Sequence, residues 1–154
     1  MRHLIVMRHA KAERGDGKTD YDRELEPRGL ADASAIAAAI AEAKLAPDTI
    51  ICSAARRTRD TLAAMLQHFP GDAEITLRRS LYDAELPDWR DAVRTAQGRC
   101  ILLIGHNPAI HQLALTLGAA EDDRLSQSYP TATASVFGMG FAIDTVRFER
   151  VFSP

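Results

Sequence analysis

The sequence predicts an α/β fold in which helices cover both faces of a mainly parallel sheet, a three-layer α/β/α sandwich. Short apolar runs alternate with segments of helical periodicity along the 154 residues, and this alternation is typical of parallel β-α-β units. Three of the apolar runs end in polar residues of a similar kind, as expected where parallel strands share one functional edge. The length suits one domain, so we expect a single domain over residues 1–154.

Composition and charge narrow the class of protein. Hydrophobic residues make up 46% of the chain and the net charge is -2, which fits a soluble globular protein and argues against a general nucleic-acid binder. No apolar stretch is long enough to span a membrane, and few residues precede the first apolar run, so we expect neither a membrane anchor nor a signal peptide. Cys52 and Cys100 lie in apolar runs and are expected to be reduced. From these features we expect a cytoplasmic protein.

The first apolar run, Leu4-Ile5-Val6-Met7, has the unbroken hydrophobicity of a strand buried on both faces. Arg8 and His9 follow at once and would therefore stand at the carboxyl edge of the sheet. The polar loop over 11–27 is long for a β-α connection, and long loops in compact domains are often functional. Its aspartates, Asp16, Asp20 and Asp22, are interpreted as solvated loop residues rather than pocket lining.

The next elements follow from periodicity and from breaking residues. An alanine-rich amphipathic helix is predicted over 28–45, with Pro27 near its first turn and Pro47 beyond its end. A buried strand over 49–52 leads into a cation-rich turn over 53–59. A helix over 58–69 and a short strand over 73–77 come next.

The second half continues the alternation. After a mixed loop over 78–87, a helix is predicted over 88–97, with Asp88 as its cap and Gly98 as its stop. The most apolar strand covers 100–104 and ends in Gly105-His106-Asn107-Pro108, and a helix over 109–117 follows it. A loop over 121–130 precedes two strands, 131–140 and 141–152, which we expect to pair antiparallel through a tight turn near Gly138 and Gly140.

Three strand ends therefore supply one candidate site. They are Arg8-His9, the turn from Ser53 to Arg57, and Gly105-His106. Guanidinium groups and imidazoles that meet at one sheet edge can bind a tetrahedral dianion.

The same residues resemble the histidine phosphatase superfamily. The matching motifs are Arg8-His9-Ala10, the Ser53, Arg57 and Thr61 spacing, and Gly105-His106-Asn107-Pro108. The short chain and the Glu26-Pro27-Arg28-Gly29 entry to the first helix are similar to its SixA-like phosphohistidine phosphatases. The resemblance covers essentially the whole chain and implies a phosphoglycerate mutase-like fold. Ala10 stands where the superfamily has Gly, and Ala54 stands where many members have Pro.

The resemblance also implies a role for each residue. His9 attacks phosphorus and becomes phosphohistidine, while Arg8, Arg57 and His106 bind the phosphoryl oxygens, with no metal or cofactor. The arginines would keep His9 neutral, its second ring nitrogen would bond a backbone carbonyl, and His106 would act as an imidazolium. Larger members carry an acidic proton donor, for which Asp83 and Glu85 are the candidates here, whereas the short members often lack one.

Several alternatives remain open at this point. The implied substrate is a protein phosphohistidine, and a small-molecule phosphomonoesterase is the alternative. A metal hydrolase using His9, His106 and an aspartate, or a non-catalytic phosphate-binding module, would also use these residues. Arg56 and Arg59 are interpreted as a solvated helix start, His111 as a surface or core histidine, and Asn107 as a cap of the following helix.

Overall fold

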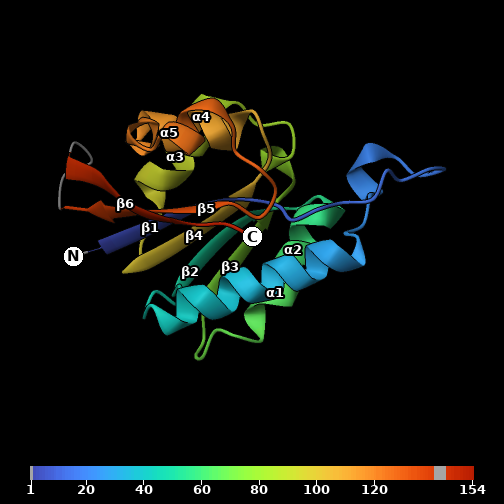
Figure 1. The fold of residues 1–154 in the computed structure, drawn as a ribbon, viewed down its shortest axis with the longest axis horizontal. Coiled ribbons are helices and arrows are strands. Elements are labelled where there is room, and N and C mark those ends of the chain that lie inside the picture. Colours follow the sequence, from blue (N-terminus) through green and yellow to red (C-terminus); the bar gives the residue numbers. More distant parts are fainter. Residues whose placement is uncertain (1, 141–144) are drawn as a thin grey trace.

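A single mixed sheet between two layers of helices forms the centre of the molecule. The structure is a computed structural model and describes residues 2–140 and 145–154. Figure 1 shows helices α1 (Pro27–Glu42) and α2 (Arg56–Leu66) on one face of the sheet. Helices α3 (Leu86–Thr95), α4 (Ala109–Thr116) and α5 (Asp123–Gln127) lie on the other. The predicted three-layer α/β/α architecture is confirmed.

The sheet has the order β3-β2-β4-β1-β5-β6. Its strands are β1 (Arg2–Arg8), β2 (Thr49–Ser53), β3 (Glu74–Arg78), β4 (Cys100–Gly105), β5 (Ala134–Met139) and β6 (Val146–Phe152). The first four strands of the sheet order run parallel, while β5 is antiparallel to β1 and β6 is antiparallel to β5. The final pair is therefore antiparallel, as expected.

Strand β1 joins the two hydrophobic cores. Leu4 to Met7 are fully buried, which confirms a strand covered on both faces. Ile5 and Met7 belong to the core beneath α1 and α2, whereas Leu4 and Val6 belong to the core beneath α3 and α4. This alternation follows from the two-residue period of a strand.

Helix boundaries differ from the predicted ones where capping decides them. Helix α1 has Pro27 at its start and ends at Glu42, three residues before the predicted end at 45, because Lys44 adopts a left-handed φ of 64°. Helix α3 begins at Leu86 rather than at Asp88. The cap residue is Glu85, and Asp88 is the third residue of the helix. Asp88 accepts a hydrogen bond from the Glu85 backbone N–H (2.9 Å), so it contributes to capping from inside the first turn instead of preceding the helix.

Helix α2 also begins earlier than predicted, at Arg56 rather than Thr58. The Thr58 hydroxyl donates to the Ser53 carbonyl (2.7 Å), and the Ala55 backbone N–H donates to Ser53 Oγ (3.3 Å). These contacts fold the chain into the helix directly after β2. As a result, Arg57 lies in the first turn of α2 instead of in a loop.

The C-terminal part contains a helix that periodicity did not predict. Within the predicted 121–130 loop, α5 starts after Asp122, whose carboxylate accepts hydrogen bonds from the backbone N–H groups of Arg124 (2.8 Å) and Leu125 (3.3 Å). Gly138 lies within β5 rather than in a turn. The first residues of the predicted last strand, 141–144, lie outside the described residues. In the described ranges, no helix is long and apolar enough to cross a membrane.

Candidate functional site

Three neighbouring strands bring the candidate residues to one edge of the sheet. Arg8 of β1 lies beside Gly105 of β4, and Cys52 of β2 lies beside Ile104. The His9 backbone N–H donates to the Gly105 carbonyl (3.0 Å), which fixes the chain just beyond β1 against the end of β4. The side chains that follow these strands therefore share one space above the carboxyl edge.

Gly105 is required by this close packing. A Cβ at this position would overlap the Trp89 ring and the Ile110 side chain, both of which belong to helices that cover the sheet. The absence of a side chain lets β4 end between α3 and α4 and delivers His106 to the site.

His9 is buried and held in one orientation. Its Nδ1 lies 2.7 Å from the Ala10 carbonyl oxygen, which can only accept, so Nδ1 carries the proton and Nε2 the lone pair. Burial lowers the pKa of His9 to about 3, and the nearby His106, Arg8 and Arg57 add to this effect. His9 is therefore neutral at physiological pH.

His106 is the second buried imidazole, with its ring centre 5.4 Å from that of His9. Its Nε2 lies 2.8 Å from Ser53 Oγ, which already accepts the Ala55 N–H and can donate its own proton to Nε2. A neutral His106 then carries its proton on Nδ1, a buried atom with no partner among the described residues. Burial is the main cause that lowers the pKa of His106 to about 4, and the positive charge of Arg57 is the second. The expected imidazolium is thus a neutral donor in this structure.

Arg8 contributes another buried donor without a partner in the described part of the chain, in addition to His106 Nδ1. One terminal nitrogen donates to the Tyr129 carbonyl (3.2 Å), whereas Nε has no hydrogen-bond partner in the described part of the chain. Asn107 donates to the same carbonyl (2.9 Å) and does not cap α4, contrary to its predicted role. Burial and the charge of Arg57 lower the pKa of Arg8, as expected where two cations lie close together with little compensation.

Arg57 contacts Asp20, from the loop between β1 and α1. Its terminal nitrogens donate to the Asp20 carbonyl (2.9 Å) and to its carboxylate (3.2 Å). The Asp20 side chain is 50% exposed, whereas that of Arg57 is only 9% exposed. The interpretation of Asp20 as a purely solvated residue was wrong, because the loop folds back onto the site.

Tyr82 and Tyr21 lie beside the site, although the sequence analysis did not assign them to it. The Tyr82 hydroxyl donates to the Asp20 carboxylate, and its ring meets His106 edge-on at 5.7 Å and Tyr21 at 4.9 Å. The hydrogen bond to Asp20 raises the pKa of Tyr82, so its hydroxyl stays protonated. Aromatic residues within polar loops were the available signal, but the distance of 62 positions between Tyr82 and Asp20 hid their contact.

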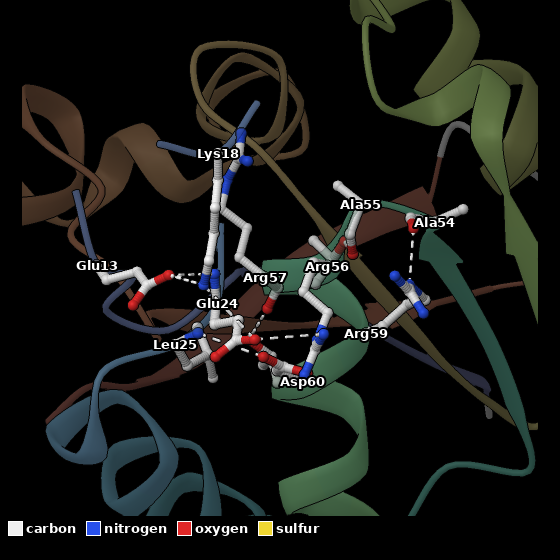
Figure 2. A network of polar contacts seen from close by, with 12 residues as sticks. Glu13, Lys18, Glu24, Leu25, Ala54, Ala55, Arg56, Arg57, Arg59 and Asp60 are labelled. Carbon is white, nitrogen blue, oxygen red and sulfur yellow. Dashed lines mark hydrogen bonds and ion pairs between the residues drawn. The ribbon is translucent and has the colours of Figure 1, made fainter. Parts of the chain in front are cut away.

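Ion pairs at the surface stabilise the loop between β1 and α1 and connect it to α2. Figure 2 shows Lys18 paired with Glu13 and Glu24, and Arg56 paired with Glu24 (3.5 Å) and Asp60 (2.8 Å). Arg59 donates instead to the Ala54 carbonyl (2.9 Å). Arg56 and Arg59 therefore already have partners within the protein. Of the three arginines Arg56, Arg57 and Arg59, Arg57 is the buried one at the site.

The third motif residue of α2 supports the His9 loop. The Thr61 hydroxyl donates to the Arg57 carbonyl (2.7 Å) and accepts the backbone N–H of Ala10 (3.0 Å). Both Ala10 and Thr61 are fully buried, which is consistent with a very small residue at position 10.

The two candidate acids are not joined to this cluster. Asp83 and Glu85 are exposed, and neither side chain contacts Arg8, His9, Arg57 or His106 through a hydrogen bond or ion pair in the described ranges. Glu85 borders an open pocket of about 450 Å³, formed by the 84–87 segment with Pro108, Ala109 and Gln112. This pocket adjoins the chain directly after His106.

His111 has a structural environment. Its Nε2 donates to the Leu125 carbonyl (2.6 Å), and its ring stacks on Tyr129 at 5.4 Å. It therefore packs α4 against the segment whose Tyr129 carbonyl holds Arg8.

The arrangement is suited to binding an oxyanion beside a nucleophilic nitrogen. Arg8 Nε and His106 Nδ1 are buried donors that an anion could satisfy, and the lone pair of His9 Nε2 belongs to a ring whose pKa both Arg8 and Arg57 lower. No cluster of three or more His, Cys, Asp or Glu residues with the geometry of a metal site occurs in the described ranges.

Comparisons with known proteins agree with this geometry. The profile of the histidine phosphatase superfamily (branch 1) matches residues 4–94. An uncharacterized protein of Mycobacterium tuberculosis is 34% identical over 143 residues, covering 84% of this chain and 85% of the relative.

Two solved structures share the fold over nearly their full length. A protein from Agrobacterium tumefaciens, described as a candidate phosphohistidine phosphatase SixA, has a TM-score of 0.88 at 25% identity and covers 99% of both chains. A similarly described protein from Nakamurella multipartitia has a TM-score of 0.83 at 26% identity, covering 99% of this chain and 96% of that one.

Proposed function

The chain belongs to the histidine phosphatase superfamily, and on that premise we propose that it is a metal-independent phosphatase acting on protein phosphohistidine. One observation carries the proposal: a neutral His9 lies beside two buried donor nitrogens, Arg8 Nε and His106 Nδ1, that have no partner in the described ranges. A phosphoryl group would satisfy both donors and bring its phosphorus to His9 Nε2.

The proposed reaction has two displacements. His9 Nε2 attacks phosphorus in line, the phosphorus–nitrogen bond of the substrate breaks, and the departing imidazole takes a proton from solvent. A water molecule then attacks the phosphoryl group on His9, loses a proton, and releases inorganic phosphate and neutral His9. Such reactions depend mainly on positioning and on stabilisation of charge on the phosphoryl oxygens.

Arg8, Arg57 and His106 would supply that stabilisation. Arg8 and Arg57 provide permanent positive charge, and His106 donates from Nδ1 without needing to be protonated. Arg57 must exchange its contact with the Asp20 carboxylate for one with the phosphoryl oxygens. A dianion competes well for this guanidinium because it carries more charge than a carboxylate.

The choice of phosphohistidine rests on the position of the acids. An alkyl ester needs an enzymic acid to protonate its leaving alkoxide, whereas a phosphorylated imidazole can be protonated by solvent at its free nitrogen. Asp83 and Glu85 lie exposed and outside the cluster.

We therefore expect kcat/KM for a phosphohistidine peptide to exceed that for a sugar phosphate by at least about 10²-fold, the usual contribution of a general acid. Steady-state assays of the wild type, Asp83→Asn and Glu85→Gln test this. Both variants should retain phosphohistidine turnover.

The alternatives make different predictions in the same assays. A better sugar phosphate rate that disappears in one carboxylate variant would identify a small-molecule phosphomonoesterase with that residue as its acid. Activity lost in excess chelator and restored by a divalent cation would indicate a metal hydrolase. Phosphate binding without turnover would indicate a binding module.

Ser53 is expected to act as a positioning residue for His106. Ser53→Ala removes the hydroxyl that holds His106 Nε2, so the ring proton can move from Nδ1 to Nε2. The loss of one such hydrogen bond predicts a fall in kcat of roughly tenfold with little change in KM. Nitrogen-15 NMR of His106 should report the changed tautomer, and an unchanged kcat with a mixed tautomer would contradict this role.

A further inference from the structure

Strand β3 leaves one side of its backbone unpaired at the border of the sheet. Among the described residues, β3 pairs only with β2, and nothing lies beyond it in the sheet order. The Glu74 N–H donates to the Asp48 carbonyl (3.0 Å) and the Arg78 carbonyl accepts from Ala54 (3.1 Å), so these two residues direct their backbone groups toward β2. By the alternation of a strand, the backbone N–H and C=O groups of Ile75 and Leu77 point outward.

The side chains of this strand are unusually apolar for an exposed edge. Ile75 is 41% exposed and Leu77 is 48% exposed, and both lie on the α1 and α2 face, opposite Ile50 and Cys52 of β2. Glu74 and Arg78 lie on the other face at the two ends of the strand. Within the described ranges, neither charged side chain forms a hydrogen bond or ion pair. Natural proteins usually protect such an edge.

The opposite border of the sheet does not share these features. In β6, Glu149 pairs with His3 (3.4 Å) and lies 3.8 Å from Arg147, while Arg150 covers the Phe152 ring at 4.3 Å. The charged side chains of β6 are thus already engaged within the chain, whereas those of β3 are free to meet a partner.

We propose that β3 pairs antiparallel with β3 of a second copy of this chain about a two-fold axis at Thr76. In this register Ile75 faces Leu77 of the second copy, and these are the residues whose backbone groups point outward, so each pair exchanges two hydrogen bonds. Glu74 faces Arg78 of the second copy at both ends. Centring the pairing on Ile75 or Leu77 instead would place Thr76 opposite one of the charges.

The pairing has a defined consequence for the assembly. Two sheets join edge to edge into one continuous sheet, and the antiparallel arrangement directs the two carboxyl edges in opposite directions. Both candidate sites therefore stay open, and dimerisation needs no change in either. A single strand pair buries little area, so the dimer should be weak and depend on concentration.

Charge exchange tests this register directly. Glu74→Arg or Arg78→Glu replaces two opposite-charge pairs of the dimer by two like-charge pairs, and each should raise the dimer dissociation constant about tenfold. The double variant Glu74→Arg with Arg78→Glu restores both pairs and should recover the dimer. Glu42→Arg, an exposed change at the end of α1, is the matched control. Sedimentation velocity from micromolar to near-millimolar protein measures the association.

Hydrogen exchange provides the second readout. The Ile75 and Leu77 amides should exchange more slowly as the wild type is concentrated, whereas in either single variant the same slowing should need about tenfold more protein. Circular dichroism and the thermal midpoint establish that the variants are folded. A wild type that is monomeric throughout the range, or a dimer that the single changes do not weaken, would overturn the proposal.

Discussion

His9→Ala is expected to reduce kcat by at least about 10⁴-fold, the scale on which a covalent nucleophile contributes. The variant lacks the nitrogen that attacks phosphorus, and no other described group replaces it, because His106 Nε2 is held by Ser53. The remaining donors, Arg8 and Arg57, should still bind phosphate. We therefore expect binding to survive while turnover is lost.

Steady-state kinetics and a phosphate-binding titration of the variant measure the two effects separately. His68→Ala is the control, because His68 lies near the end of α2 and bonds Ser34 (2.6 Å), away from the three strand ends. A His9→Ala enzyme that keeps substantial turnover would remove His9 from the mechanism.

Arg57→Lys is expected to lower kcat/KM by on the order of 10² to 10³-fold, the cost of one charged donor to a developing anion. The charge is retained, but an ammonium group does not reproduce the planar pair of guanidinium donors. In this structure that pair binds the backbone carbonyl oxygen and one carboxylate oxygen of Asp20. The change therefore separates the geometry of the donor from its charge.

The matched control comes from the same helix turn. Arg59→Lys makes the same substitution at an exposed residue whose contact is the Ala54 carbonyl, and it should leave kcat/KM nearly unchanged. If Arg57→Lys keeps wild-type activity and Arg59→Lys loses it, the phosphate-binding arginine was assigned to the wrong position.

Local pattern was sufficient to predict a mainly parallel sheet and the sheet edge at which the candidate residues gather. Unbroken apolar runs such as Leu4 to Met7 identify doubly buried strands, and the polar residues after them necessarily meet at the carboxyl edge of a parallel sheet. Helix ends were less predictable, because they depend on single hydrogen bonds. Helix α2 begins before the predicted residue because the Thr58 hydroxyl bonds the Ser53 carbonyl. Helix α1 ends before the predicted residue, and Lys44 after it has a left-handed backbone conformation.

Contacts made by the long loop could not be read from the sequence. Asp20 reaches Arg57 across 37 positions and Tyr82 across 62, and no periodicity encodes such pairings. The protonation of His106 was also beyond sequence reasoning. The resemblance implied an imidazolium at His106, but burial and the charge of Arg57 lower its pKa, and the Ser53 contact favours a neutral ring with its donor at Nδ1.

The most direct test of the account is to trap phosphate on the enzyme. Brief mixing with a labelled phosphohistidine peptide, followed by an alkaline quench within a single turnover, should leave label on the protein. We expect this label to be stable to alkali, labile to acid, and located by peptide mapping at His9, with none in His9→Ala. Complete turnover without protein-bound label, or label that persists unchanged in His9→Ala, would contradict a phosphohistidine intermediate.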